Sequence, residues 1–418
     1  MTSTPPETFP DAAASDPRAL GWMQGAPPAP DRVIAMTDRD LFRFPKSRWA
    51  FSHMRQLAPT AGVSRGLGAP STLGRRIDDA IDGLTFTPIG GATPVTWAES
   101  LAANYTDGLV VLHDGDIVYE TYAGALTETG QHCAFSVTKS MMGLLAESLI
   151  VEGALDPDAP VADLIAELAG SAFGDATVRQ VLDMTTGLRY SETYADPKAD
   201  VWVYSAATSP LPKPEGFTGP RTFFDYLRTV AKDGEHGEAF AYKTINTDAL
   251  GWILARTTGR STAELLSERI WSRIGAEQDG YMTIDSIGVP FAGGGLSAGL
   301  RDLARVGQMV LDGGVAQGRQ IVPSAAIDSL FGGGDPARFA KAGYGLLPGW
   351  SYRGMWWITH NAHRAIMARG VYGQSLYVDP TARMVIARFS SHPIAANAGN
   401  DPVTLPAFQA VGEHLARR

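Results

Sequence analysis

The stretch CAFSVTKSMMGLLAESLI, residues 133–150, carries the most information in the chain. Ser136 stands where a helix could begin, because small and polar residues there give way to apolar residues at helical spacing. Ser136 and Lys139 would then lie one turn apart on one face of that helix. A serine hydroxyl becomes a nucleophile when a neighbouring base takes its proton, and a lysine can do so when burial lowers its pKa. These two residues alone leave the alternative of a helix-capping serine beside a solvated lysine open.

Two later segments add residues that suit the same chemistry. Residues 238–259 (EAFAYKTINTDALGWILARTTG) place Tyr242 and Asn246 in a turn before an amphipathic helix that ends at Gly259. Residues 368–374 (ARGVYGQ) contain glycines that would let the backbone approach a substrate closely. Tyr242 taken alone is more typical of a core tyrosine, so the prediction of a serine hydrolase depends on all three segments together.

Alternating apolar and polar residues predict strands at both ends of the chain. Residues 108–123 (GLVVLHDGDIVYETYA) alternate around Asp114 and Gly115, which are typical of a hairpin turn. Residues 375–380 and 384–389 read as two further strands separated by a turn. We therefore expect strands from both ends to share one sheet.

The middle of the chain is predicted to be largely helical, with a surface loop at 209–220 (SPLPKPEGFTGP). Three groups of apolar residues recur at helical spacing there: Met141, Leu144, Leu145 and Leu149; Leu250, Ile253 and Leu254; and Leu303, Val306, Met309 and Val310.

Composition is that of an ordinary globular protein. The 418 residues are 44% hydrophobic, and 35 basic against 44 acidic residues give a net charge of -9. Without a long basic run, nucleic acid and anionic membranes are not expected as partners. Cys133 is the single cysteine, which excludes an intrachain disulfide and is read as a small buried residue. Residues 1–35 are read as an extended or disordered arm without a secretory signal, which predicts a cytoplasmic location.

The three segments, in this order, resemble the serine β-lactamase and penicillin-recognising superfamily. The similarity includes flanking motifs: FSVTKS (135–140), VEGALD (151–156), TVRQVL with TGL (177–182 and 186–188), and GGLS with DLAR (294–297 and 302–305). The class C-like branch of esterases and 6-aminohexanoate-dimer hydrolases is most similar, on Tyr242-x-x-x-Asn246, YSETYADP (190–197) and RWAF (48–51). The resemblance covers roughly residues 48–390.

This resemblance implies an α/β, three-layer fold like that of class C β-lactamases, with an antiparallel sheet flanked by helices. Residues 36–156 and 301–418 would form the α/β domain, and residues 157–300 an inserted, mostly helical domain. It also implies an acyl-enzyme mechanism. The catalytic residues would be Ser136, Lys139 and Tyr242, the oxyanion would be held by the amides of Ser136 and Val371, and the substrate-binding residues would be Tyr194, Asn246, Gly293, Gly370 and Tyr372.

Four positions depart from the relatives' patterns. Thr244 stands where penicillin-binding relatives carry the Asn of Tyr-x-Asn, and Ala368 stands where they carry Lys or His, so we expect no useful β-lactamase activity unless Arg369 substitutes. Gly293 replaces an Asn and Ser205 an acidic residue of the amide-hydrolysing relatives. We therefore expect esters as substrates, with linear amides such as 6-aminohexanoate oligomers cleaved weakly or not at all.

No metal or cofactor is expected, since His360 and His363 lack an accompanying carboxylate motif and are read as surface or structural residues. The expected partner is a small ester or amide molecule, and a homodimer is left open. A β-lactamase or D-amino-acid peptidase is the alternative activity. A sensor that keeps the fold without turnover is the alternative of another class.

Overall fold

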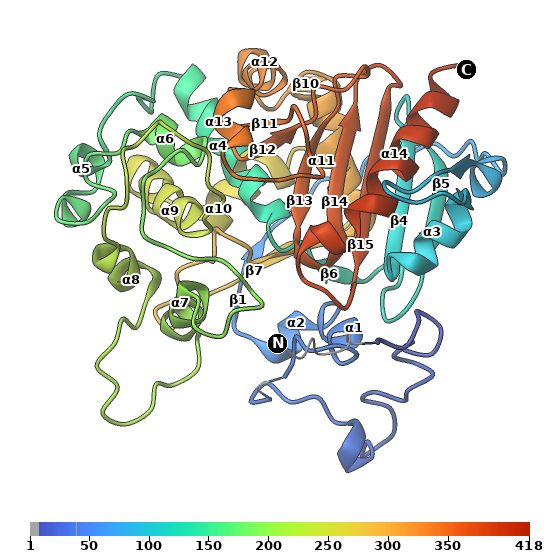
Figure 1. Cartoon of the computed structure of the whole chain (residues 1–418), viewed down its shortest axis with the longest axis horizontal. Coiled ribbons are helices and arrows are strands. Elements are labelled where there is room, and N and C mark those ends of the chain that lie inside the picture. Colours follow the sequence, from blue (N-terminus) through green and yellow to red (C-terminus); the bar gives the residue numbers. More distant parts are fainter. Residues whose placement is uncertain (1–7, 39) are drawn as a thin grey trace.

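The largest sheet has seven strands, in a computed structural model that describes residues 8–38 and 40–418 (Figure 1). Its strand order is β11, β12, β13, β14, β15, β4, β5, and neighbouring strands are antiparallel. The strands span Thr106–His113 (β4), Asp116–Tyr122 (β5), Ser351–Arg353 (β11), Trp356–Ile358 (β12), Ile366–Gly370 (β13), Gln374–Asp379 (β14) and Met384–Ser390 (β15). The predicted antiparallel sheet is confirmed.

The hairpin predicted around Asp114 and Gly115 connects β4 and β5. Both residues have positive φ, 50° and 84°, as the two-residue turn that suits the twist of paired strands requires. On its other edge β4 pairs with β15, with Val111 opposite Ile386. Strands from both ends of the chain therefore share one sheet, as predicted.

Most of the regular elements in the middle of the chain are helices, and Figure 1 shows α5, α6, α8, α9 and α10 gathered beside the main sheet. The three helices predicted from apolar spacing are α4, α9 and α11, and α9 is followed by the predicted Gly259, with φ 68°. The predicted loop at 209–220 connects α7 and α8. None of the helices in the described residues is long and apolar enough to cross a membrane.

The α-helices span Ser47–Ala50 (α1), Met54–Leu57 (α2), Trp97–Ala103 (α3), Val137–Val151 (α4), Val161–Leu164 (α5), Val178–Leu182 (α6), Asp200–Thr208 (α7), Phe223–Thr229 (α8), Ile245–Thr258 (α9), Thr262–Leu266 (α10), Leu300–Leu311 (α11), Ser324–Gly332 (α12), Pro336–Ala340 (α13) and Asp401–Leu415 (α14). Short 3-10 turns span Pro30–Arg32, Ile81–Gly83, Ala166–Leu168, Val371–Gly373 and Asn397–Gly399, and a π-helical turn spans Ser267–Trp271.

Helices cover both faces of the main sheet. Consecutive strand residues point to opposite faces. On β15, Val385 lies against Gly307 of α11, whereas Met384 lies against Gly412 of α14. α11 and α14 are therefore on opposite sides, and α3 packs beside α14. The result is the layered arrangement of helices around an antiparallel sheet that the resemblance implies.

A second sheet of four strands leads the chain into the candidate site. Its order is β1, β7, β8, β6, and β6 ends at Cys133, three residues before Ser136. The strands span Thr60–Val63 (β1), Gln131–Cys133 (β6), Gly280–Thr283 (β7) and Leu296–Gly299 (β8). Two further pairs join Thr85–Phe86 (β2) to Val95–Thr96 (β3), and Val315–Ala316 (β9) to Arg319–Gln320 (β10).

The N-terminal arm differs from the expected extended or disordered segment. Residues 1–7 lie outside the described residues, and from residue 8 the chain runs through turns and one 3-10 turn. Ser15 is fully buried, and its hydroxyl accepts a hydrogen bond of 3.0 Å from Arg48. The buried guanidinium of Arg48 needs hydrogen-bond acceptors, and this part of the arm supplies them. The contact therefore holds this part of the arm in place.

Candidate active site

α4 brings Ser136 and Lys139 together. Ser136 is the N-cap residue of α4, but its hydroxyl makes no capping hydrogen bond to the helix. It accepts instead a hydrogen bond of 2.9 Å from Nζ of Lys139. Lys139 is only 1% exposed. The alternative of a capping serine beside a solvated lysine is therefore wrong.

The environment of Lys139 lowers the pKa of its amine. Burial lowers the pKa of Lys139 to about 8, while the charges of Glu192 and Asp248 act in the opposite direction. Nearly every residue of α4 is buried, so little water reaches this lysine. Nζ also donates a hydrogen bond to the carbonyl of Gly293. At mildly alkaline pH the amine can therefore accept a proton from Ser136.

Tyr242 lies beside the same amine. Nζ of Lys139 is 5.2 Å from the centroid of the Tyr242 ring. Burial raises the pKa of the Tyr242 phenol well above its ordinary value and Glu192 raises it further, while hydrogen bonding with Ser136 acts in the opposite direction. The phenol is therefore protonated at neutral pH and can donate its proton to a group bound at Ser136.

Two backbone amides near the nucleophile are available to a ligand. Val371 follows β13 and lines the same cavity as Ser136. Within the described part of the chain, neither amide donates a hydrogen bond to a protein acceptor. Phe135 precedes Ser136 with φ 46°, a conformation that costs energy for a residue with a side chain and often marks functional sites. Two such N–H groups beside a nucleophile can stabilise an oxyanion.

The cavity beside Ser136 measures about 330 Å³, within the usual range for small-molecule sites. Its walls combine aromatic and aliphatic side chains with three charged ones, and Arg369 forms an ion pair with Asp401. The lining residues are Ser136, Glu192, Tyr194, Tyr242, Gly343, Tyr344, Gly345, Leu346, Leu347, Trp357, Arg369, Gly370, Val371, Ala396, Asn397, Ala398 and Asp401.

Glu192 is a candidate that the sequence analysis did not single out. Its carboxylate accepts hydrogen bonds from the Tyr194 hydroxyl (2.8 Å), the Thr244 amide (2.7 Å) and the Thr244 hydroxyl (2.5 Å). These donors fix a charged group in the cavity wall near Lys139. Glu192 lies two residues before Tyr194 in the segment 190–197, so that segment was the available signal.

The predicted substrate-binding residues do not all reach the cavity. Tyr194 and Gly370 line it. Tyr372 is not among the residues that line it and packs instead against Phe51 and Phe135, with ring centroids 4.9 Å and 5.4 Å apart. Tyr372 follows Val371 in the chain and Phe135 precedes Ser136, so this ring contact connects the backbone next to both free amides.

Asn246 and Gly293 lie behind the candidate catalytic groups. Asn246 is in the first turn of α9 rather than before it, and its fully buried Oδ1 accepts a hydrogen bond of 2.7 Å from Thr186. Gly293 holds Lys139 through its carbonyl, and Ser205 is on the exposed side of α7. Neither Gly293 nor Ser205 lines the cavity, so the geometry gives no direct support to the expectation that they remove support from an amide nitrogen, and that expectation stays a prediction.

The surroundings of Cys133, His360 and His363 indicate structural roles for these residues. Cys133 is buried, and burial raises the pKa of its thiol to about 12. Nε2 of His360 is 2.7 Å from the Ser351 hydroxyl, and Nδ1 of His363 is 2.7 Å from Oδ2 of Asp379. Across residues 8–38 and 40–418, no group of three or more His, Cys, Asp or Glu side chains could hold a metal ion.

Comparison with known proteins finds relatives along most of the chain. The Beta-lactamase family profile matches residues 98–404. A 6-aminohexanoate-dimer hydrolase of Paenarthrobacter ureafaciens is 34% identical over 404 residues, 94% of this chain and 92% of the relative. A solved structure from Bacillus anthracis, assigned as a 6-aminohexanoate-dimer hydrolase, is 30% identical with a TM-score of 0.84, over 94% of this chain and 99% of its own. A family VIII carboxylesterase, at 17% identity and a TM-score of 0.53 over 75% of this chain and 97% of its own, shares the fold.

Proposed function

The chain belongs to the β-lactamase family, and we propose that it is a serine hydrolase that cleaves carboxylic esters through an acyl-enzyme on Ser136. One observation carries the proposal: the Ser136 hydroxyl accepts a 2.9 Å hydrogen bond from a lysine that is 1% exposed. A serine without a capping role, next to a buried amine of lowered pKa, has what nucleophilic catalysis requires.

In the proposed acylation, Oγ of Ser136 bonds to the acyl carbon while its proton passes to the neutral amine of Lys139. The amides of Ser136 and Val371 hold the negative oxygen of the tetrahedral intermediate. When the bond to the leaving alkoxide breaks, Tyr242 gives that oxygen its proton and regains one from Lys139. Water then attacks the acyl-enzyme by the same proton path in reverse, releasing the acid and restoring Ser136.

Linear amides are the second substrate class that we propose. An amide nitrogen needs protonation before it can leave, so amides demand more of Tyr242 than esters do. Glu192 and the hydroxyl of Tyr194 lie in the cavity wall and could hold the N–H of an amide. The 6-aminohexanoate-dimer hydrolase that is 34% identical to the chain supports this class, as does the 30% identical protein that is assigned as one.

β-Lactams are disfavoured as substrates. Ala368 supplies no cation at the position where penicillin-binding relatives carry Lys or His, and it is buried in strand β13. Arg369 does line the cavity, but its ion pair with Asp401 compensates the charge that a β-lactam carboxylate would need.

We also propose a cytoplasmic location. The single cysteine allows no intrachain disulfide, and it is a buried thiol, so nothing in the fold depends on an oxidising compartment. Fractionation of cells that express the chain would test this placement.

The test of the function is Ser136→Ala, assayed on p-nitrophenyl butyrate, the linear dimer of 6-aminohexanoate and nitrocefin. We expect the wild type to cleave the ester fastest, the dimer more slowly and nitrocefin not measurably, and Ser136→Ala to lose all activity because no other group can form the acyl bond. A fluorophosphonate should add one label to Ser136 of the wild type, detected by mass spectrometry.

Ser148→Ala is the matched control, since Ser148 is buried on the same helix and only donates to the Leu144 carbonyl. It should keep wild-type rates and labelling. Residual ester turnover in Ser136→Ala would contradict the nucleophile. A wild type that is neither labelled nor active on any of the three substrates would favour the non-catalytic sensor, and fast nitrocefin turnover would favour a β-lactamase.

A further inference from the structure

The carboxylate of Asp248 is connected to Lys139 through Gly293. Asp248 lies in the first turn of α9 and is 5% exposed. Its Oδ1 accepts a hydrogen bond of 3.0 Å from the amide of Gly293, and its Oδ2 accepts one from the hydroxyl of Tyr204. Gly293 in turn accepts from Nζ of Lys139 through its carbonyl. Gly293, which accepts a hydrogen bond from the amine of Lys139, is thus itself hydrogen-bonded to the buried carboxylate of Asp248.

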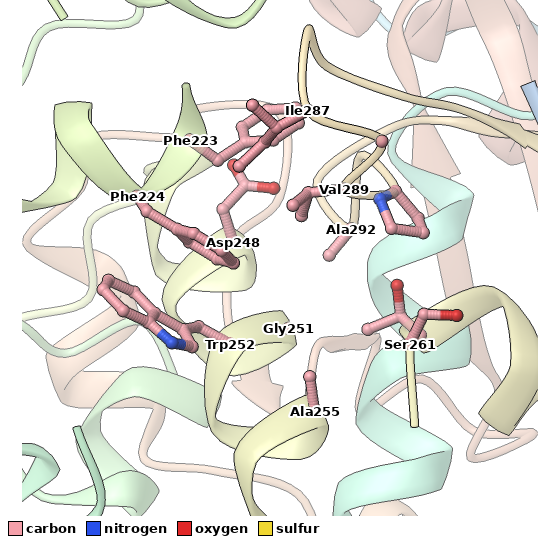
Figure 2. A pocket seen from close by; sticks show the side chains of 13 residues that line it. Phe223, Phe224, Asp248, Gly251, Trp252, Ala255, Ser261, Ile287, Val289 and Ala292 are labelled. Carbon is pink, nitrogen blue, oxygen red and sulfur yellow. The ribbon is translucent and has the colours of Figure 1, made fainter. Parts of the chain in front are cut away.

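The surroundings of Asp248 leave few ways to stabilise its charge. Figure 2 shows its side chain between Phe223 and Phe224 on one side and Val289 and Ala292 on the other. These residues line a second cavity of about 150 Å³ whose walls are mostly apolar. A carboxylate in such a place is costly unless it is hydrogen-bonded and paired.

We propose that Asp248 is a positioning residue for Lys139: through Gly293 it fixes the carbonyl that orients the amine toward Ser136, and its charge sets the pH range in which that amine is neutral. This inference rests on the proposed function, because it assigns a role toward the proposed base. Tyr204 completes the arrangement by donating to the other carboxylate oxygen. Asp248 itself touches neither the substrate cavity nor the reacting atoms.

The electrostatics agree with this role. Burial raises the pKa of Asp248, while hydrogen bonding from Tyr204, the charge of Lys139 and the Gly293 amide act in the opposite direction and Glu192 raises it further. Glu192 and Asp248 in turn both favour the protonated form of Lys139. Among the residues that the structure describes, the phenol of Tyr242 is a third titratable group that faces the amine. Removing the charge of Asp248 should therefore lower the pKa of Lys139, because one of its two anionic neighbours is lost.

The variant Asp248→Asn separates this role from a structural one. An Asn can still accept from Gly293, but it carries no charge and its Nδ2 cannot accept from Tyr204. For p-nitrophenyl butyrate we expect the plateau kcat to fall about tenfold with KM within about twofold, since the change acts on the base and not on substrate binding. The acid limb of the kcat–pH profile should move to lower pH, because the base is needed neutral and its pKa is lowered.

Asp302→Asn is the matched control. Asp302 is equally buried, its pKa is also raised mainly by burial, and it accepts backbone hydrogen bonds from Glu277 and Gln278, away from the cavity. This control should lose stability without moving the acid limb. If Asp248→Asn does not fold, Tyr204→Phe serves in its place, with an expected fall in kcat of about threefold at unchanged KM.

The outcomes distinguish this inference from the proposed function. A wild type labelled by fluorophosphonate at Ser136, with an acid limb that moves in Asp248→Asn and not in Asp302→Asn, supports both. A labelled wild type in which both Asn variants keep the wild-type acid limb overturns the role of Asp248 alone, as does wild-type kcat in Tyr204→Phe. A wild type that is not labelled overturns the proposed function and the role of Asp248 with it.

Discussion

At the scale of single residues, Lys139 and Tyr242 act in the proposed mechanism on one proton. Lys139→Ala and Tyr242→Phe should each lower kcat by about 10² or more, the usual size of lost general acid–base catalysis. Because residues that act as a unit give non-additive losses, the double variant should be little slower than either single one. Steady-state kinetics on p-nitrophenyl butyrate measure all three.

Tyr352→Phe is the control for the loss of a buried phenol. Tyr352 lies next to Tyr242, with ring centroids 6.3 Å apart, and its hydroxyl contacts only the sulfur of Met355. It should stay within about twofold of the wild-type kcat, because no reacting group depends on it. Single losses that multiply in the double variant would show that Lys139 and Tyr242 work on separate protons.

The sequence allowed Ser136, Lys139 and Tyr242 to be proposed because each belongs to a short motif with its own chemistry. Gly293 could not be judged in the same way, since its role depends on neighbours that fold against it. A Cβ at residue 293 would lie 2.5 Å from Cγ2 of Thr244 and 2.7 Å from the ring of Phe291. An Asn there would disturb the loop that holds Lys139 rather than reach an amide substrate.

At the scale of elements, α4 depends on close contact with the turn before β12. A Cβ on Gly143 would lie 1.9 Å from the carbonyl oxygen of Gly354, a backbone atom that cannot move aside alone. We expect Gly143→Ala to lower the free energy of unfolding by about 1–3 kcal/mol, the usual range for overpacking. Urea unfolding followed by circular dichroism measures it.

Gly170→Ala is the matched control for that substitution. Gly170 is exposed, and nothing lies within 4 Å of the Cβ that it would gain. Its unfolding free energy should stay within about 0.5 kcal/mol of the wild type. Equal stability of the two variants would mean that α4 can shift away from Gly354 without loss.

The predictable elements were those with a long enough pattern. The hairpin of β4 and β5 alternates over about fifteen residues around an Asp-Gly turn, and α4, α9 and α11 each repeat apolar residues over several turns. β1, β6, β7 and β8 have three or four residues each, which is too short for a period to appear. Their sheet forms because distant segments pair, as Thr60 does with Thr283, and local sequence does not contain that information.

At the scale of the whole molecule, Arg48 connects the N-terminal arm to two neighbouring strands of the main sheet, at the start of β4 and just after the end of β15. It is 2% exposed. It donates hydrogen bonds to the Ala12 carbonyl (2.5 Å), the Ser15 hydroxyl (3.0 Å) and the Ser391 hydroxyl (3.2 Å), and it forms an ion pair of 3.2 Å with Asp107 at the start of β4. One side chain thus joins the N-terminal arm, the start of β4 and the segment that follows β15.

The division into an α/β part, 36–156 with 301–418, and an inserted part, 157–300, stays a prediction. All seven strands of the main sheet come from the first set of residues, which supports it. The second sheet crosses the division, since β7 and β8 pair with β1 and β6. Ser136 follows β6 directly, so the candidate site lies where the two parts are joined by backbone hydrogen bonds.

The contribution of the Arg48 contacts to stability can be tested by Arg48→Ala. The variant would leave Asp107, which is fully buried, with only His132 as a partner at 3.3 Å. Breaking a buried ion pair from one side commonly costs about 3–5 kcal/mol, so we expect a loss of this size in the free energy of unfolding by urea. Arg43→Ala, at an exposed position five residues before Arg48, should change it by no more than about 0.5 kcal/mol. If the two variants were equally stable, the contacts of Arg48 with Ala12 and Asp107 would not hold the arm in place, and deleting the arm should then leave stability unchanged as well.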